Sequence, residues 1–234
     1  MTKVSDLSIL YEDNHLIAIN KNVSDIVQGD KTGDEPLTEK VKSYLKEKYN
    51  KKGNVYLGLP HRLDRPVSGI VLLAKTSKAL VRLNKMFQSK DIQKIYWAIV
   101  KDSPKKEKDG LENFLIRNTK QNKSYISNER KKNAKKAILL YKTIAQSDRY
   151  SLLEVTLKTG RHHQIRAQLA HIGHPIKGDL KYGYSRSNPD KGISLHARKL
   201  SFWHPVKDEM IEIIAPTPKN DVLWQFFEKE MANS

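Results

Sequence analysis

The sequence contains no cysteine among its 234 residues. This absence excludes disulfide bonds, thiolate catalysis and zinc or iron–sulfur sites with cysteine ligands. It also lacks any run of about 18 apolar residues, so no transmembrane span is predicted. The first residues do not form the apolar core of a signal peptide. We therefore expect a cytoplasmic protein without a membrane partner.

Acidic residues are scarce relative to basic ones. The 43 lysine and arginine residues outnumber the 26 aspartate and glutamate residues, which gives a net charge of +17. Such an excess is typical of a protein that binds a polyanion, although a basic surface can also serve solubility alone. Residues 101–142 carry 13 basic and five acidic side chains. Within them, the candidate contacts to nucleic acid are Lys131, Lys132, Lys135 and Lys136.

Hydrophobic periodicity predicts more strands than helices. Strands are expected near 8–12, 15–20, 70–74, 95–100, 111–117, 137–145, 153–157, 194–203 and 209–215, with a basic loop over 130–136 between two of them. Helical spacing predicts helices over 37–49, from an N-cap at Ser77 to about Phe87, over 165–172, and after a cap at Asn220. These elements predict an α+β fold with a mixed, mostly antiparallel sheet and flanking helices. No linker interrupts them, so we expect one catalytic domain over residues 1–234.

A charged loop precedes the continuous apolar run at 70–74. Asp64 lies in it between Arg62 and Arg65, and these cations favour the ionised carboxylate. An ionised aspartate on a loop beside a buried strand can act as a nucleophile, a base or an electrostatic stabiliser. The alternative is a structural ion pair that braces the turn.

Six segments, in order along the chain, resemble the motifs of the RluA-type RNA pseudouridine synthases. The most specific is His61-Arg62-Leu63-Asp64, which is followed by Ser68-Gly69, an apolar run and Ala74-Lys75-Thr76. The other five are the strand pair ending in Asn20-Lys21, and the segments 94–100, 160–170, 174–183 and 195–205. Together they extend over about residues 8–216, and the resemblance favours a catalytic role for Asp64 over the ion-pair alternative.

The resemblance implies the isomerisation of uridine to pseudouridine in ribosomal or transfer RNA. The N-glycosidic bond breaks, the uracil turns, and it is rejoined to the ribose through carbon 5. By the same resemblance, Asp64 is the catalytic aspartate, Tyr96 stacks on the base and helps remove the proton from carbon 5, and Arg166 pairs with Asp64. No cofactor is expected, because the reaction needs no redox step or group donor.

The target uridine has to leave the base stack before its ribose can be reached. The resemblance makes Arg62 the candidate for insertion into the RNA, although a contact to phosphate is the alternative. The expected RNA-binding residues are His61, Arg62, Arg65, Arg161 and the four lysines named above. We expect a monomer without a separate N-terminal RNA-binding module.

Two positions depart from the family pattern. His162 stands where the family usually has threonine, and residues 22–26 replace its usual Pro-x-Gly. His162, His163, His171 and His174 suggest a zinc site, but their spacing fits no common ligand pattern, so we expect no metal.

Other functions are compatible with parts of the pattern. The main alternative function is a non-catalytic RNA-binding protein on the same scaffold. A glycoside or nucleoside hydrolase would usually need a second carboxylate, which these motifs lack. Trp97 is expected to point into the core, since neighbouring strand residues face opposite sides.

Overall fold

The computed structural model describes residues 7–30, 33–127 and 131–232. The chain divides into two compact units. The first comprises Met1–Gln93 and Arg198–Pro216, and the second comprises Lys94–Ala197 and Thr217–Ser234. Strand β9 (Leu195–Trp203) contributes residues to both units. The single catalytic domain expected from the sequence stays a prediction.

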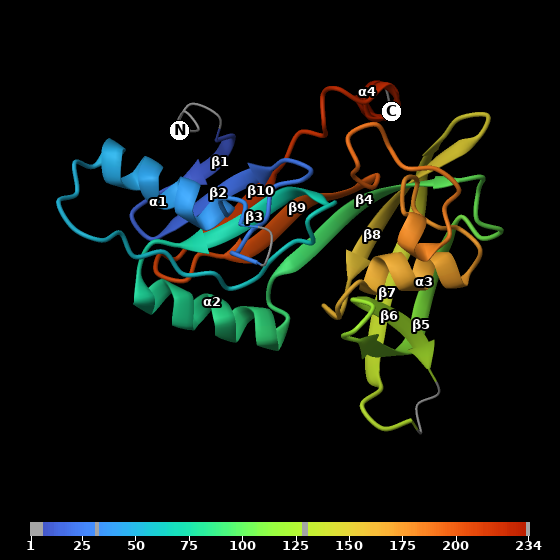
Figure 1. Cartoon of the computed structure of the whole chain (residues 1–234), viewed down its shortest axis with the longest axis horizontal. Coiled ribbons are helices and arrows are strands. Elements are labelled where there is room, and N and C mark those ends of the chain that lie inside the picture. Colours follow the sequence, from blue (N-terminus) through green and yellow to red (C-terminus); the bar gives the residue numbers. More distant parts are fainter. Residues whose placement is uncertain (1–6, 31–32, 128–130, 233–234) are drawn as a thin grey trace. The chain divides into compact units, whose positions relative to one another are not determined.

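The first unit is a small sheet with two helices. Its strands are β1 (Ile9–Glu12), β2 (Leu16–Lys21), β3 (Ser68–Ala74) and β10 (Met210–Ile214), together with the end of β9. Its helices are α1 (Leu37–Lys48) and α2 (Ser77–Ser89). Every residue of β3 is buried, which confirms the strand predicted from the apolar run. Helix α2 packs on one face of these strands, below them in Figure 1.

The second unit carries six neighbouring strands in the order β9-β4-β8-β7-β5-β6. The new strands are β4 (Gln93–Lys101), β5 (Lys108–Asn118), β6 (Lys123–Ser127), β7 (Lys135–Gln146) and β8 (Tyr150–Leu157). The helices are α3 (Gln164–His171), the short 3-10 helix η2 (Leu180–Tyr182) and α4 (Val222–Ala232).

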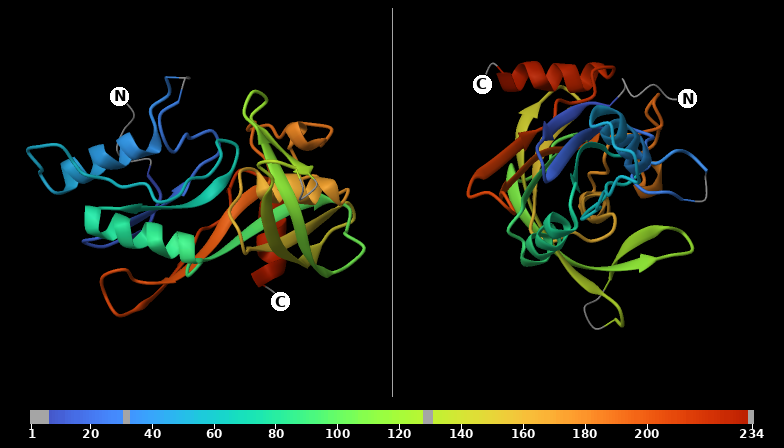
Figure 2. Two further views of the ribbon diagram at one scale, coloured as in Figure 1. Left: turned by 90° about the horizontal axis from the view of Figure 1, so that it is seen from below. Right: turned by 90° about the vertical axis from the view of Figure 1, so that its left-hand side faces the viewer.

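Two helices cover different parts of this second sheet. Ala167 of α3 packs with Ala137 and Leu115, whereas Trp224 of α4 packs with Trp97. Helix α4 is the red helix at the top of the right-hand view in Figure 2. Trp97 is 6% exposed, so its predicted place in the core is confirmed.

The α+β class with a mostly antiparallel sheet is confirmed, but the structure corrects several local predictions. Thr76 rather than Ser77 caps α2, because its hydroxyl accepts the Ala79 N–H. Asp221 rather than Asn220 accepts the N–H groups of the final helix.

The predicted basic loop also differs from the structure. Strand β6 was not predicted, because it is short and mostly polar, and β7 begins at Lys135, so Lys135 and Lys136 lie in a strand. Arg130 of that predicted loop lies outside the described residues. Within the part of the chain that the structure describes, no helix is long and apolar enough to cross a membrane.

Candidate active site

A buried lysine fixes the backbone of the Asp64 loop through hydrogen bonds. Lys21, at the end of β2, is 1% exposed, and its Nζ donates to the carbonyl oxygens of Asn22 (2.8 Å), Asp25 (2.8 Å) and Arg65 (3.1 Å). An ammonium group has three N–H donors, so these three carbonyls satisfy it. The 22–26 segment, which departs from the family pattern, is thereby joined to the loop that carries Asp64.

The charge of Lys21 depends on this environment. Burial lowers its pKa to about 8, against the opposing attraction of Asp25 and Asp64. The ammonium therefore carries its charge at neutral pH and interacts electrostatically with Asp64.

His61 fixes the start of the same loop. Its Nε2 accepts the backbone N–H of Leu72 in β3 at 2.9 Å, and its ring stacks on Phe87 of α2 at 4.8 Å between centroids. A ring nitrogen that accepts a hydrogen bond is unprotonated, so the His61 proton of the neutral ring lies on Nδ1. These contacts give His61 a structural role, and its expected contact with RNA stays a prediction.

The side chains of the loop point to different environments. Asp64 is half-buried, whereas Arg62 and Arg65 are exposed. Arg65 donates to the Asp34 carboxylate at 2.5 Å, in a pair whose members are 43% and 51% exposed. The loop thus places a half-buried carboxylate between two exposed cations.

Arg166 of α3 lies in the second unit, in a buried network of hydrogen bonds. Its Nε and Nη2 donate to the two carboxylate oxygens of Asp179 at 2.7 and 2.9 Å, and both side chains are nearly inaccessible. Its Nη1 lies 3.0 Å from Nε2 of His163, and its guanidinium lies over the ring of Tyr182 at 5.1 Å. A bidentate pair of this kind fixes both the position and the plane of the guanidinium.

The hydrogen bonds of Tyr182 define the protonation of His163. The Tyr182 hydroxyl accepts the N–H of Ser124 (2.8 Å) and donates to its carbonyl (3.0 Å), so His163 Nδ1, at 3.0 Å, must donate to it. Nε2 is then the acceptor for Arg166. Burial and the charge of Arg166 lower the His163 pKa to about 2, which agrees with a neutral ring.

Tyr96 lies on the same face of the second sheet as α3. It is paired with Val155, Val155 is paired with Tyr141, and Ala137 lies four residues from Tyr141 on the same strand face. Ala137 contacts Ala167 of α3. Tyr96 is half-buried and Trp97 faces the other side, so the two aromatic residues are separated as predicted.

The four lysines of this unit that are expected to bind RNA lie in β7 and in the turn before it. Lys131, Lys132, Lys135 and Lys136 are all exposed. Lys136 pairs with Glu112 at 2.6 Å, and its carbonyl accepts from Nε of Arg161 at 2.9 Å. Their contact with RNA stays a prediction. Among the described residues, no group of three or more His, Asp or Glu side chains could hold a metal ion.

The predicted site residues form two groups. His61, Arg62, Asp64 and Arg65 share one loop of the first unit, and Tyr96, Arg161, Arg166 and the four lysines belong to the second. The predicted pair between Asp64 and Arg166 would use further N–H groups of the guanidinium, which has five in all. That pair stays a prediction.

Several residues that support the site were missed from the sequence. Lys21, His163, Asp179 and Tyr182 lie inside segments that resemble family motifs, yet no role was assigned to them. Their spacing in the matched segments was the available signal, but it does not show that Asp179 reaches back 13 residues to Arg166.

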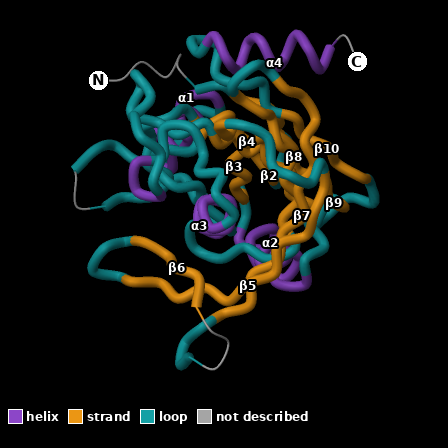
Figure 3. The backbone as a smooth tube through the Cα atoms, turned by 90° about the vertical axis from the view of Figure 1, so that its right-hand side faces the viewer, coloured by secondary structure: helices purple, strands orange, loops and turns teal. Residues whose placement is uncertain are grey.

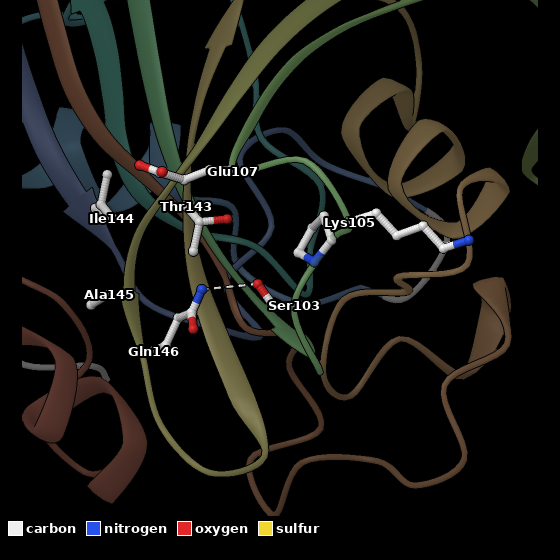
Figure 4. A pocket seen from close by; sticks show the side chains of 8 residues that line it. Ser103, Lys105, Glu107, Thr143, Ile144, Ala145 and Gln146 are labelled. Carbon is white, nitrogen blue, oxygen red and sulfur yellow. Dashed lines mark hydrogen bonds between the residues drawn. The ribbon is translucent and has the colours of Figure 1, made fainter.

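A separate hollow of about 400 Å³ lies in the second unit. It is bounded by residues 103–107 and by the end of β7 (Figure 4). Thr143, on its wall, adjoins an irregularity in the pairing of β7 with β8. None of the predicted site residues lines it, so we assign it no part in catalysis.

Comparison with known proteins gives consistent matches. The family model described as RNA pseudouridylate synthase matches residues 15–171. An RNA pseudouridine synthase of Synechocystis is 35% identical over 218 residues, which cover 91% of this chain and 66% of that protein. The tRNA pseudouridine synthase C of Vibrio vulnificus is 31% identical, with 95% of both chains covered. The ribosomal large subunit pseudouridine synthase C of the same species is 31% identical and covers 92% of this chain and 68% of that protein.

Solved structures show the same fold. The structure of human RNA pseudouridylate synthase domain containing 4 matches with a TM-score of 0.80 and 24% identity, over 94% of this chain and 92% of that one. Human RNA pseudouridylate synthase domain containing 1 matches with a TM-score of 0.74 and 23% identity, over 93% of this chain and 86% of that one. The motifs, the extent of the family match and the fold agree, and the chain therefore belongs to the RNA pseudouridylate synthase family of the RluA type, a family of isomerases that act on uridines in RNA.

Proposed function

We propose that this protein converts uridine to pseudouridine in RNA and that Asp64 is its catalytic carboxylate. The observation that carries the proposal is the position of Asp64, which is half-buried between the exposed Arg62 and Arg65 on a loop whose backbone Lys21 fixes. A carboxylate so placed can face the ribose of a uridine while the cations meet the adjacent phosphates.

The bond changes of the reaction balance without a cofactor. The bond between N1 of uracil and C1′ of ribose breaks, and a bond between C5 and C1′ forms. C5 loses its proton, and N1 gains one. Asp64 either attacks the sugar or removes a sugar proton, and Tyr96 is proposed to stack on the uracil and assist loss of the C5 proton.

Arg166 is proposed to orient Asp64. Its support is the rigidity of the guanidinium, which Asp179 and His163 hold in one plane. A fixed cation can select one orientation of a carboxylate through paired N–H donors.

The RNA substrate is proposed to be ribosomal or transfer RNA. The relatives at 31% identity include one named for the large ribosomal subunit and one named for tRNA, so both classes are tested together. The target base has to be flipped from its stack, with Arg62 proposed to occupy the vacated position. We further propose that the protein is a cytoplasmic monomer that works as one catalytic domain, which light scattering and cell fractionation can check.

The deciding experiment uses Asp64→Asn, which keeps the shape of the side chain and removes its charge. Transfer RNA and large-subunit ribosomal RNA transcripts carrying tritium at C5 of uridine release the label when pseudouridine forms. We expect wild-type release and a loss of at least about 10³-fold in the variant, the scale of losing a group that acts directly on the reacting atoms.

Asp34→Asn is the matched control, because it removes a neighbouring exposed carboxylate that binds Arg65. It should keep most of the activity. RNA affinity, measured by fluorescence anisotropy, should change little in Asp64→Asn. Full activity of Asp64→Asn would refute the catalytic assignment, and RNA binding without tritium release by the wild type would favour the non-catalytic alternative.

A further inference from the structure

The β5–β6 hairpin, which comprises residues 108–127, is an edge element of the second unit. Strand β6 stands at the end of the strand order and pairs with β5. Figure 3 shows the two strands running out from the sheet beneath α3. The turn at 119–122 is closed by a bond from the Asn122 N–H to the Thr119 carbonyl, and Asn122 has a positive φ of 45°.

The tip of this hairpin is suited to nucleic acid. Residues 117–127 contain three cations and no acidic residue. Arg117 and Lys120 are exposed, and Tyr125 is 41% exposed on the outer strand. Lys123 lies over the rings of Tyr125 and Tyr182, at 5.2 and 4.9 Å. Cations combined with an exposed aromatic ring are the components with which proteins bind unpaired RNA.

The imidazole of His162 connects this hairpin to the N-terminal end of α3. Its Nε2 lies 3.1 Å from Oδ1 of Asn122, and its Nδ1 lies 2.9 Å from Oγ of Ser124. Ser124 Oγ also lies 2.7 Å from the His162 carbonyl oxygen, so its single proton is shared between these two acceptors. One side chain therefore binds both the turn and the inner face of β6.

The partners of Asn122 show which His162 nitrogen carries a proton. Oδ1 of Asn122 also accepts from Nη2 of Arg117 at 3.3 Å, and arginine can only donate. The oxygen assignment is therefore fixed, and Nε2 of His162 must be a donor. A threonine, the usual family residue here, has one short hydroxyl and cannot span the two partners.

The attachment of the hairpin and the support of Arg166 share the same residues. The ring of His162 stacks on His163 at 3.8 Å, and His163 accepts from Arg166. Tyr182 binds the backbone of Ser124 and also His163. Arg166 nevertheless keeps its own bidentate pair with Asp179, so removal of His162 leaves its main support in place.

We propose that the β5–β6 hairpin binds the backbone of the substrate RNA and that His162 is the positioning residue that holds it on α3. The inference rests on the proposed function for the identity of the RNA. It assigns His162 to substrate binding, because the hairpin residues bear the cations while Arg166 is held independently.

The test compares His162→Ala and His162→Gln with the wild-type protein, on transcripts of transfer RNA and large-subunit ribosomal RNA. We expect KM in the tritium-release assay, and Kd by anisotropy, to rise about five- to tenfold in His162→Ala, the scale of one or two net hydrogen bonds. The kcat should stay within about twofold. Hydrogen exchange should accelerate in residues 118–127, and the Gln variant, whose amide can donate to Asn122, should recover part of the affinity.

The matched control is His171→Ala, which removes an exposed histidine at the other end of α3. It should leave KM, Kd and hairpin exchange unchanged. A general loss of stability would lower kcat per enzyme in His162→Ala without raising KM, and that result would overturn the inference. Unchanged Kd and unchanged exchange would do the same. If the wild-type protein released no tritium, the proposed function would fail, while Kd and exchange would still decide the role of His162.

Discussion

The Asp64 loop and the Arg166 network achieve order by different means. In the loop, the ammonium of Lys21 holds backbone carbonyls, and the arginine side chains stay at the surface. In the network, the side chains themselves are buried and bonded to one another, with Asp179 1% exposed and Arg166 5% exposed. The first arrangement fixes a backbone whose arginine side chains are exposed, whereas the second fixes one guanidinium. Substitutions should therefore affect stability most in the network, and pH should affect the loop.

The largest effect is expected for Asp179→Ala. Removal of one partner of a buried ion pair leaves the other charge uncompensated and costs about 3–5 kcal/mol in the free energy of unfolding. Urea unfolding followed by tryptophan fluorescence measures this, since Trp97 and Trp224 are buried in the same unit. Asp148→Ala, at an exposed turn, is the control and should stay within about 0.5 kcal/mol of wild type. Equal stability of the two variants would show that the network is no more ordered than the surface.

A pH titration should separate the two regions. Above the Lys21 pKa of about 8, the amine has two N–H donors for three carbonyls, and the Asp64 loop is held by one hydrogen bond fewer. The pKa of His163, about 2, leaves the Arg166 network unchanged over the same range. We expect kcat to fall about tenfold from pH 7 to pH 9, because one unit above a pKa leaves about a tenth of the group charged, and a flat profile would show that the loop does not need the ammonium.

The free energy of unfolding should change with pH in the opposite direction to kcat. The pKa of Lys21 is lowered from 10.5 to about 8 by burial, so between these values the unfolded chain binds more protons than the folded one. The Lys21 contribution to the free energy of unfolding therefore rises with pH in that window. Lys21→Met should lack this rise. A stability profile shared by both proteins would contradict the assignment of the titration to Lys21.

A smaller effect is expected from the basic residues of β7 and its preceding turn. Replacement of Lys131, Lys132, Lys135 and Lys136 by glutamine should reduce the slope of log Kd against log salt by about 0.7–0.9 for each phosphate that the protein no longer neutralises. The control replaces Lys46, Lys51, Lys52 and Lys78, four exposed lysines of the first unit, and matches the change in net charge. An identical slope for both variants would assign the effect to overall charge rather than to this surface.

Strand and helix positions were largely predictable, because apolar residues recur with the local period of each element. The run at 70–74 and the alternation around Leu153 and Val155 marked β3 and β8 correctly. Strand β6 was not predictable in this way, because it is short and its sequence, Lys-Ser-Tyr-Ile-Ser, is polar at three of five positions. Its place depends on bonds from Ser124 to Tyr182 and His162, which are distant in the chain.

The candidate site shows the same division. The types of residue and their order along the chain identified Asp64, Tyr96 and Arg166 as candidates, since a family pattern is carried by spacing. Nothing local in the sequence indicated that Asp179 holds Arg166, that Lys21 binds the Arg65 carbonyl, or that His61 bonds to β3.

The amino-acid sequence by itself determined the class of fold, the family and the loop that presents a carboxylate between two cations. Only the tertiary structure decided which partner each buried charge has, and hence which histidine nitrogen carries a proton. The physical reason is the separation along the chain over which each kind of interaction acts. Periodicity and motif spacing act between near neighbours in the chain, whereas a buried charge is satisfied by whatever donor or acceptor the folded backbone brings within about 3 Å.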